Sequence, residues 1–154
     1  MMKILVAVDE SESSHKAFEQ ALRLINHQDT TFLVLGVEEP VIIPSMSPVP
    51  GVFGEAPSTV WQEETEAVEL EEKQTKSAIL WAENLCHEKG VQFISRLEYG
   101  EPKNVICDVA QQENCDLIVI GSHGYGVIER VLLGSVTDHV VHHAHCAVLV
   151  VRES

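Results

Sequence analysis

The clearest pointer to the architecture is the stretch DLIVIGSHG at residues 116–124. Residues 116–120 form a short, apolar run that lacks the polar–apolar alternation of a strand with one exposed face. Such a run predicts a strand buried on both faces, as in parallel sheets that helices cover on both sides. Gly121 and Gly124 follow it and predict a tight loop, because glycine adopts backbone conformations that other residues avoid.

Further apolar runs predict the rest of the sheet. We expect strands at residues 4–8, 31–37, 91–97, 116–120 and 147–151, with the alternating third run near a sheet edge. Helical spacing of apolar residues predicts helices around 17–25, from 61 to 89, from Pro102 and from Ser135, which we expect to be an N-cap. This alternation predicts an α/β fold with a parallel sheet and right-handed crossovers.

Residues 38–60 interrupt this pattern. They hold five of the chain's six prolines, which exclude a helix or a central strand. We therefore expect a long loop inserted into a single domain that spans residues 1–154. The acidic run from Glu63 to Glu72 comes next, and we interpret it as the solvated face of the following helix.

Composition narrows the class of protein. Ten Lys and Arg residues stand against 24 Asp and Glu, a formal net charge of −14. That charge repels phosphate backbones and anionic lipid, so we expect no nucleic-acid or membrane partner. The N-terminal apolar run stops at Asp9, too soon for a signal peptide, and the four cysteines form no CxxC pair. These features predict a cytoplasmic protein with free thiols.

Two expected strand ends carry residues that suit ligand binding. The first strand ends at Ala7, Val8 and Asp9, and the fourth ends at Gly121. If these strands are neighbours, both ends face one crevice, where open α/β sheets bind ligands. Ser135 begins a helix there, and the free N–H groups of a helix start bind anions, most commonly phosphate. A nucleotide would place its ribose hydroxyls on Asp9 and its phosphates over the glycines and Ser135.

The chain resembles the universal stress protein family over essentially its whole length. The resemblance is carried by KILVAVDES at 3–11, DLIVIGSHG at 116–124, LLGSV at 132–136 and VLVV at 148–151. The ATP-binding subgroup of that family has the pattern G-2x-G-9x-G-[S/T]. Gly121, Gly124, Gly134 and Ser135 satisfy each of its positions.

The resemblance implies a five-stranded sheet ordered 3-2-1-4-5 with helices on both faces, an adenine nucleotide alpha hydrolase-like or Rossmann-like fold. It also implies bound ATP or AMP, often together with Mg²⁺, and a homodimer formed through residues 147–151. An exposed, apolar terminal strand of this kind pairs readily with another strand, which favours the same dimer.

By position, the resemblance also implies the ligand contacts. The base and sugar side comprises Ala7, Val8, Asp9, Val37, Ile120 and Gly121, and the phosphate side comprises His123, Gly124, Gly134, Ser135 and Val136. Asp9 would hold the ribose, and the backbone around Val8 and Val37 would hold the adenine. Arg130 is a further candidate, since a guanidinium can bind a γ-phosphate with two hydrogen bonds.

These features favour a nucleotide-dependent regulatory module of the stress response, without an assigned catalytic residue or metal ligand. The alternatives are a slow ATP hydrolase using His123 and Arg130, and a chaperone-like protein that binds partners through residues 41–57. A phosphoacceptor receiver domain is disfavoured, because the third strand ends in Leu97, Glu98 and Tyr99 without an acceptor aspartate. The histidines between 139 and 145 have metal-ligand spacing but also suit a helix C-terminus. The sequence names no signalling partner.

Overall fold

The structure is a computed structural model that describes residues 1–40, 58–123 and 133–152, with backbone only for 58–65. Strands and helices alternate along the chain, as the sequence predicts. They are β1 (Met2–Ala7), α1 (Glu12–Leu24), β2 (Thr30–Glu38), α2 (Ser58–Lys89), β3 (Gln92–Tyr99), α3 (Pro102–Gln112), β4 (Leu117–Gly121), α4 (Ser135–His143) and β5 (Ala147–Val151).

The sheet has five parallel strands in the order β3-β2-β1-β4-β5, which confirms the expected topology. β1 lies between β2 and β4, with Val6 opposite both Val34 and Val119. The direction of strand succession reverses here, so the carboxyl ends of β1 and β4 lie beside each other. β3 and β5 form the two edges, and the alternating third strand is at an edge as expected.

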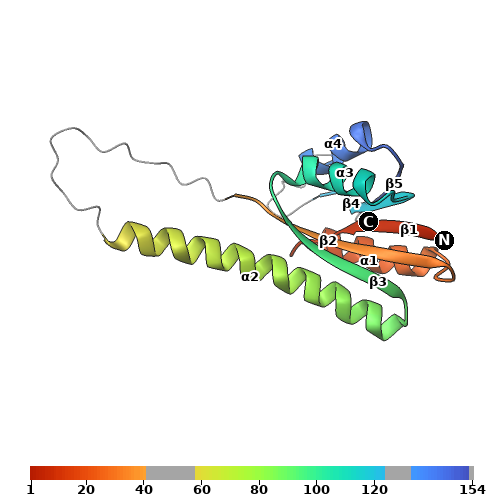
Figure 1. Ribbon diagram of the computed structural model, residues 1–154, viewed down its shortest axis with the longest axis horizontal. Helices are drawn as coiled ribbons and strands as arrows, with labels where there is room; N and C mark the ends of the chain where they lie inside the picture. Colours follow the sequence, from red (N-terminus) through yellow and green to blue (C-terminus); the bar gives the residue numbers. More distant parts are fainter. Residues whose placement is uncertain (41–57, 124–132, 153–154) are drawn as a thin grey trace.

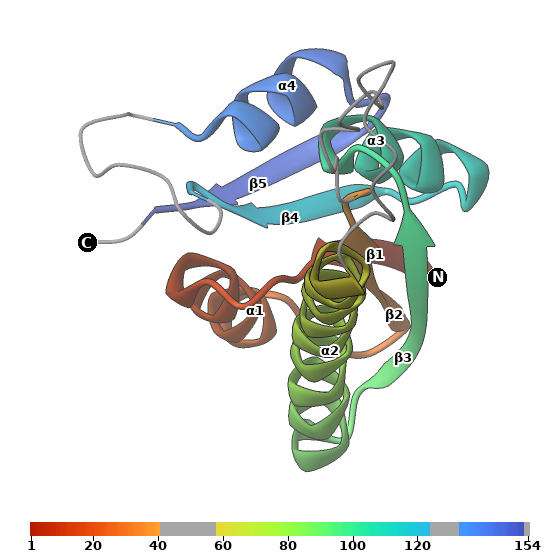
Figure 2. The ribbon, with the colours of Figure 1, turned by 90° about the vertical axis from the view of Figure 1, so that its left-hand side faces the viewer.

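Helices cover both faces of the sheet. Figure 2 shows α1 and α2 on one side and α3 and α4 on the other. Successive strand residues point to opposite faces. Val34 therefore packs into the core under α1 and α2 with Phe18 and Ala82, whereas Leu35 packs under α3 with Ile106. Burial on both faces explains the unbroken apolar runs of the central strands.

Helix α2 has 32 residues, and Figure 1 shows it running well past the strands at its N-terminal end. The side chains at 66–70 are exposed, whereas Ala78, Ile79 and Ala82 are buried against β2 and its neighbours. Gly36 of β2 permits this contact, because a Cβ there would lie 2.7 Å from Ile79 Cδ1 and 3.0 Å from Thr75 Cγ2. α2 therefore approaches the sheet more closely than any larger residue at position 36 would allow.

Two expected helix starts needed correction. Helix α2 begins at Ser58 rather than at residue 61, so it enters the proline-rich segment, whose residues 41–57 lie outside the described residues. Gly134 is the N-cap of α4, and Ser135 is the first helical residue. Ser11 caps α1, its Oγ accepting a hydrogen bond from the Ser14 N–H.

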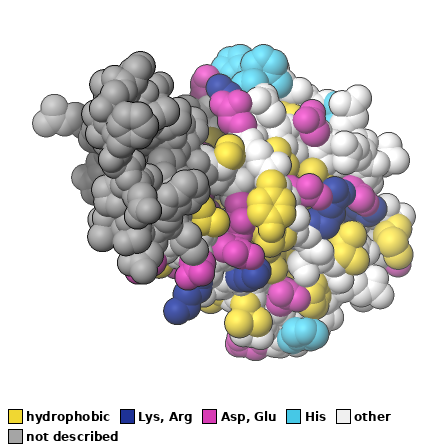
Figure 3. Space-filling model, turned by 60° about the vertical axis from the view of Figure 1, so that its left-hand side comes forward, with side chains coloured by type: hydrophobic (Ala, Val, Ile, Leu, Met, Phe, Trp, Pro, Cys, Tyr) yellow, Lys and Arg dark blue, Asp and Glu magenta, His cyan; other side chains and the backbone are white. Residues whose placement is uncertain are grey.

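The surface carries an excess of acidic groups, and acidic side chains are spread over the face shown in Figure 3, in keeping with the net charge of −14. None of the helices in the described ranges is long and apolar enough to cross a membrane. All four cysteines are free thiols, with Cys86 and Cys115 buried.

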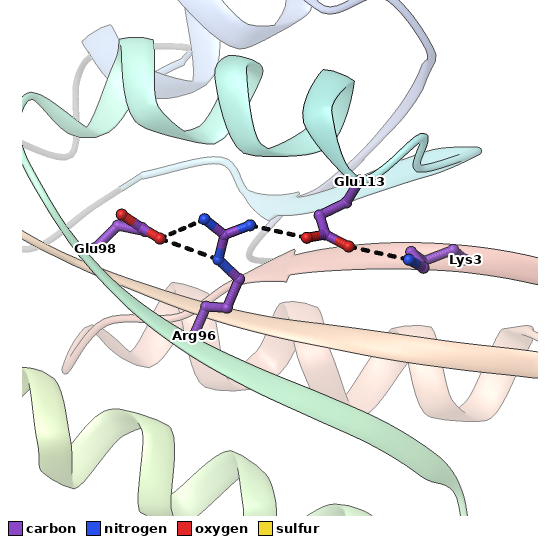
Figure 4. A network of polar contacts seen from close by, with 4 residues as sticks. All are labelled: Lys3, Arg96, Glu98 and Glu113. Atoms are coloured by element: carbon purple, nitrogen blue, oxygen red, sulfur yellow. Dashed lines mark hydrogen bonds and ion pairs between the residues drawn. The ribbon is translucent and has the colours of Figure 1, made fainter.

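A chain of ion pairs crosses the sheet from β1 to β3 and joins both strands to the end of α3 (Figure 4). The carboxylate of Glu113 accepts from Lys3 Nζ at 3.1 Å and from Arg96 Nη1 at 3.0 Å. Arg96 also pairs with Glu98 on its own strand. Hydrogen bonding from Lys3, with the charge of Lys3 and of Arg96, lowers the pKa of Glu113. The network therefore favours the folded state once Glu113 is ionised.

Candidate functional site

A cavity of about 360 Å³ opens at the carboxyl ends of β1, β2 and β4. Its walls come from the strand ends, from the starts of α3 and α4, and from the middle of α2. The described lining residues are Ala7, Val8, Asp9, Glu10, Ser14, Leu35, Val37, Glu39, Glu71, Gln74, Thr75, Pro102, Ile106, Ile120, Gly121, His123, Gly134, Ser135 and Val136. The cavity therefore occupies the crevice that the strand reversal creates.

Ten of the twelve residues singled out from the sequence line this cavity. They are Ala7, Val8, Asp9, Val37, Ile120, Gly121, His123, Gly134, Ser135 and Val136. The other two, Gly124 and Arg130, lie outside the described residues. Residues more than 100 positions apart in the sequence, such as Asp9 and Ser135, thus meet in one place because β1 and β4 are neighbours.

Asp9 is held in a fixed orientation by the turn that leads into α1. Its Oδ1 accepts a hydrogen bond from the Ser11 N–H at 2.7 Å, and its own N–H donates to Ser14 Oγ at 2.9 Å. These bonds leave Oδ2 without a hydrogen-bond donor among the described residues. A carboxylate in this state can accept hydrogen bonds from the hydroxyl groups of a ligand.

The opposite wall is the junction between β4 and α4. The Gly134 N–H donates to Ser122 O at 2.8 Å, and Thr137 Oγ1 donates to Gly121 O at 2.7 Å, so the helix start is tied to the strand end. The first N–H groups of α4, including those of Ser135 and Val136, have no acceptor within the helix. With the helix dipole, they make this end of the cavity attractive to an anion.

His123 lies beside this junction and is half-buried. Its Nδ1 lies 3.1 Å from Ser122 Oγ, and its backbone N–H donates to Ser13 Oγ at 3.3 Å. The backbone of His123 is therefore tied to α1, and its imidazole contacts Ser122, directly after β4. At the mouth of the cavity it can donate a hydrogen bond to an anionic ligand.

Helix α2 supplies a wall that sequence reasoning missed. Glu71, Gln74 and Thr75 line the cavity, although the acidic run was interpreted as a solvated face. That interpretation fits residues 66–70, which are exposed, but not Glu71, which is half-buried. The signal that marks this wall is Gly36, a residue without a side chain in an otherwise bulky strand, which lets α2 approach.

The cavity has an acidic end and an amide-lined end. Carboxylates of Asp9, Glu10, Glu39 and Glu71 line it, and no Lys or Arg does so among the described lining residues. Behind the β2 end, Glu38 is only 7% exposed, and within the described part of the chain its Oε1 has no hydrogen-bond partner. Burial, reinforced by the charges of Glu72 and Glu71, raises the pKa of Glu38. An anionic group therefore belongs at the α4 end, away from Glu38, Glu39 and Glu71.

Comparison with known proteins identifies the family of the chain. The model of the universal stress protein family matches residues 1–152. Universal stress protein Sll1388 of Synechocystis sp. is 35% identical over 153 residues, covering 97% of each chain.

Two solved structures show the same architecture. Universal stress protein UspA from Lactobacillus plantarum has a TM-score of 0.78 at 28% identity, covering 98% of this chain and 97% of its own. A universal stress protein family protein from Arabidopsis thaliana, solved with AMP bound, has a TM-score of 0.68 at 25% identity, covering 100% and 93%. The match to residues 1–152, with a 35% identical relative of nearly equal extent, shows that this chain belongs to the universal stress protein family.

Proposed function

We propose that this chain binds an adenine nucleotide, ATP or AMP, in the cavity and acts in the cytoplasm as a nucleotide-dependent regulatory module of the stress response. One observation carries the proposal: a single cavity holds the free amides of the α4 start and, across from them, the oriented carboxylate of Asp9. A nucleotide monophosphate or triphosphate needs both groups, because it carries anionic phosphates at one end and, next to them, ribose hydroxyls that donate hydrogen bonds. The AMP-bound relative from Arabidopsis supports the choice of adenine.

The geometry suggests how the ligand would lie. The phosphates would rest on the N–H groups of Ser135 and Val136 beside His123, and the ribose would bind Asp9. The base would reach the end of β2 near Val37. Gly124 and Arg130 would add phosphate contacts from the segment outside the described residues.

A Mg²⁺ companion would depend mainly on the nucleotide. Among the described residues, no three potential ligating side chains come together for a metal ion. Mg²⁺ bound with a nucleotide usually takes its ligands from phosphates and water, with one or two carboxylates. Glu10, next to Asp9 at the β1 end, is the acidic lining residue that fits that limited role, because Asp9 is assigned to the ribose.

We also propose a homodimer formed through β5. This strand is an edge of the sheet, and its residues Val148 to Val151 are only half-buried. Antiparallel pairing with a second copy about a two-fold axis would cover that edge. Light scattering at micromolar concentration should give the mass of two chains, and Val150→Lys should shift it toward one. A single-chain mass for the unchanged protein would contradict the dimer.

Isothermal titration calorimetry with ATP, AMP and 2′-deoxy-ATP tests the binding site. In Asp9→Asn the side-chain carbonyl oxygen can still accept from the Ser11 N–H. The second carboxylate oxygen is replaced by an NH₂ group, which cannot accept a hydrogen bond from a ribose hydroxyl. A hydrogen bond to a charged group contributes roughly 1.5–3 kcal/mol, so ATP should bind about 10- to 100-fold more weakly.

The variant should also lose any preference for ATP over 2′-deoxy-ATP. Glu19→Gln, on the exposed side of α1, is the matched control and should bind like the unchanged protein. Failure of the unchanged protein to bind any of the three nucleotides at millimolar concentration would refute the proposed function.

A further inference from the structure

The α2 wall of the cavity carries polar side chains, and it lies where the base of a bound nucleotide would end. β2 and β4 are separated by β1, so their ends are roughly 10 Å apart at the usual strand spacing. An anion at the start of α4 therefore leaves the rest of the ligand pointing toward β2. Val37 and Glu39 from β2 line that end together with Glu71 and Thr75 from α2.

Of the three α2 residues in this wall, Glu71 and Thr75 present hydrogen-bond acceptors, and the side-chain amide of Gln74 can donate or accept. Thr75 Oγ1 donates its proton to the backbone oxygen of Glu71 at 3.0 Å, so the hydroxyl offers only lone pairs to the cavity. The Glu71 side chain has no hydrogen bond or ion pair within the described part of the chain, and it is half-buried. It lines the cavity together with Val37 and Glu39 at the end of β2. A ligand group that meets Glu71 and Thr75 must therefore supply donors.

The close packing of α2 on the strand keeps this wall in place. Thr75 and Ile79 lie directly over Gly36, with no space for a Cβ between them. Ala78 and Ala82, on the same helix, are buried in the core. Glu71 is one helical turn before Thr75 and lies on the same face of α2, so the packing of Thr75 also fixes the position of Glu71 relative to the strand end.

We propose that Glu71, with the Thr75 hydroxyl oxygen beside it, accepts a hydrogen bond from the exocyclic amino group of the bound base and so selects an amino-bearing base. The proposal rests on the proposed nucleotide site and adds a side chain from α2 to it. Adenine presents a 6-amino group, a donor with two hydrogens. Hypoxanthine presents an oxygen at the same position, and its lone pairs would face the carboxylate with no hydrogen between them.

The test compares ATP with inosine triphosphate, which carries oxygen in place of the 6-amino group. The unchanged protein should prefer ATP by about 10- to 100-fold in dissociation constant. In Glu71→Ala the ratio should fall at least about fivefold, whereas Glu71→Gln, which keeps one acceptor oxygen, should retain part of it. The ratio is the proper readout, because removing a negative charge strengthens the binding of both triphosphates alike.

Glu69→Ala is the matched control, since Glu69 is an exposed acid of the same helix outside the cavity; its ratio should equal that of the unchanged protein. Thermal unfolding of each variant establishes that it is folded. An unchanged ratio in Glu71→Ala, or no ATP preference in the unchanged protein, would overturn this inference while leaving nucleotide binding intact. Absence of binding to both triphosphates would instead refute the proposed function itself.

Discussion

Replacing Gly121 with alanine should force helix α1 away from the end of β4. A Cβ at position 121 would lie 2.5 Å from Ser13 Oγ, 2.8 Å from the Ser13 carbonyl oxygen and 2.9 Å from its carbonyl carbon. Ordinary van der Waals contact begins near 3.4 Å, so the backbone of α1 must retreat by a substantial part of an ångström. A backbone cannot rotate aside as a side-chain end can. The cost should therefore lie at the upper end of the range for overpacking, about 3 kcal/mol.

Urea unfolding measures this cost, and a second glycine calibrates it. A Cβ at Gly36 would meet side-chain atoms only, Ile79 Cδ1 at 2.7 Å, Ile79 Cγ1 at 2.9 Å and Thr75 Cγ2 at 3.0 Å. Because side-chain atoms of β-branched residues yield less than a free chain end but more than a backbone, Gly36→Ala should cost about 2 kcal/mol, less than Gly121→Ala. For a chain of this size the Gly121 variant should melt roughly 6–12 °C lower than the unchanged protein. The reasoning fails if Gly121→Ala changes the unfolding free energy by less than about 0.5 kcal/mol, or if Gly36→Ala proves the more harmful.

Three further predictions concern titratable groups. The pKa of Glu38 is raised by burial, so the protonated side chain stabilises the fold at low pH and this stabilisation is lost as pH rises above 4.5. In urea unfolding, Glu38→Gln should therefore raise the free energy of unfolding by about 1–2 kcal/mol at pH 7 and leave it unchanged below pH 4.5. The pKa of Glu113 is lowered through Lys3, so Glu113→Gln should lose about 1 kcal/mol at pH 7, and the loss should shrink as pH falls below 4.5. Burial raises the pKa of Cys86 and Cys115 to about 11, so few of these thiols are ionised and reactive at pH 8. Mass spectrometry should show that iodoacetamide at pH 8 labels them at least about 100-fold more slowly in the folded protein than in the urea-unfolded protein.

The first glycine of the G-2x-G-9x-G-[S/T] pattern has a structural reason that the pattern itself hides. From the sequence, Gly121 favours a backbone that approaches a ligand without a side chain in the way. The structure shows that the missing Cβ faces Ser13 of α1, although Gly121 also lines the cavity. The residue thus serves helix packing as well as the cavity, and the unfolding series separates this packing role from ligand binding.

Much of the fold was readable from local patterns. Buried parallel strands leave unbroken apolar runs, and these gave every strand of the described sheet to within a few residues. Element ends were less accurate: β3 continues to Tyr99 rather than 97, and α2 begins at Ser58 rather than 61. Ends depend on capping bonds and on fraying, which differ from residue to residue more than the apolar face does.

The sequence by itself determined the strand ends that form the cavity. Asp9 follows one apolar run and the loop to the α4 start follows another, and the composition of both runs predicts buried strands. Only the tertiary structure decided that Glu71 and Thr75 complete the cavity, since a polar residue on a long helix looks the same whether it meets solvent or a ligand. The distance between α2 and the sheet decides whether these side chains line the cavity or face solvent. That distance is set by the absent side chain of Gly36 and the residues packed over it, which lie more than 35 positions away in the chain.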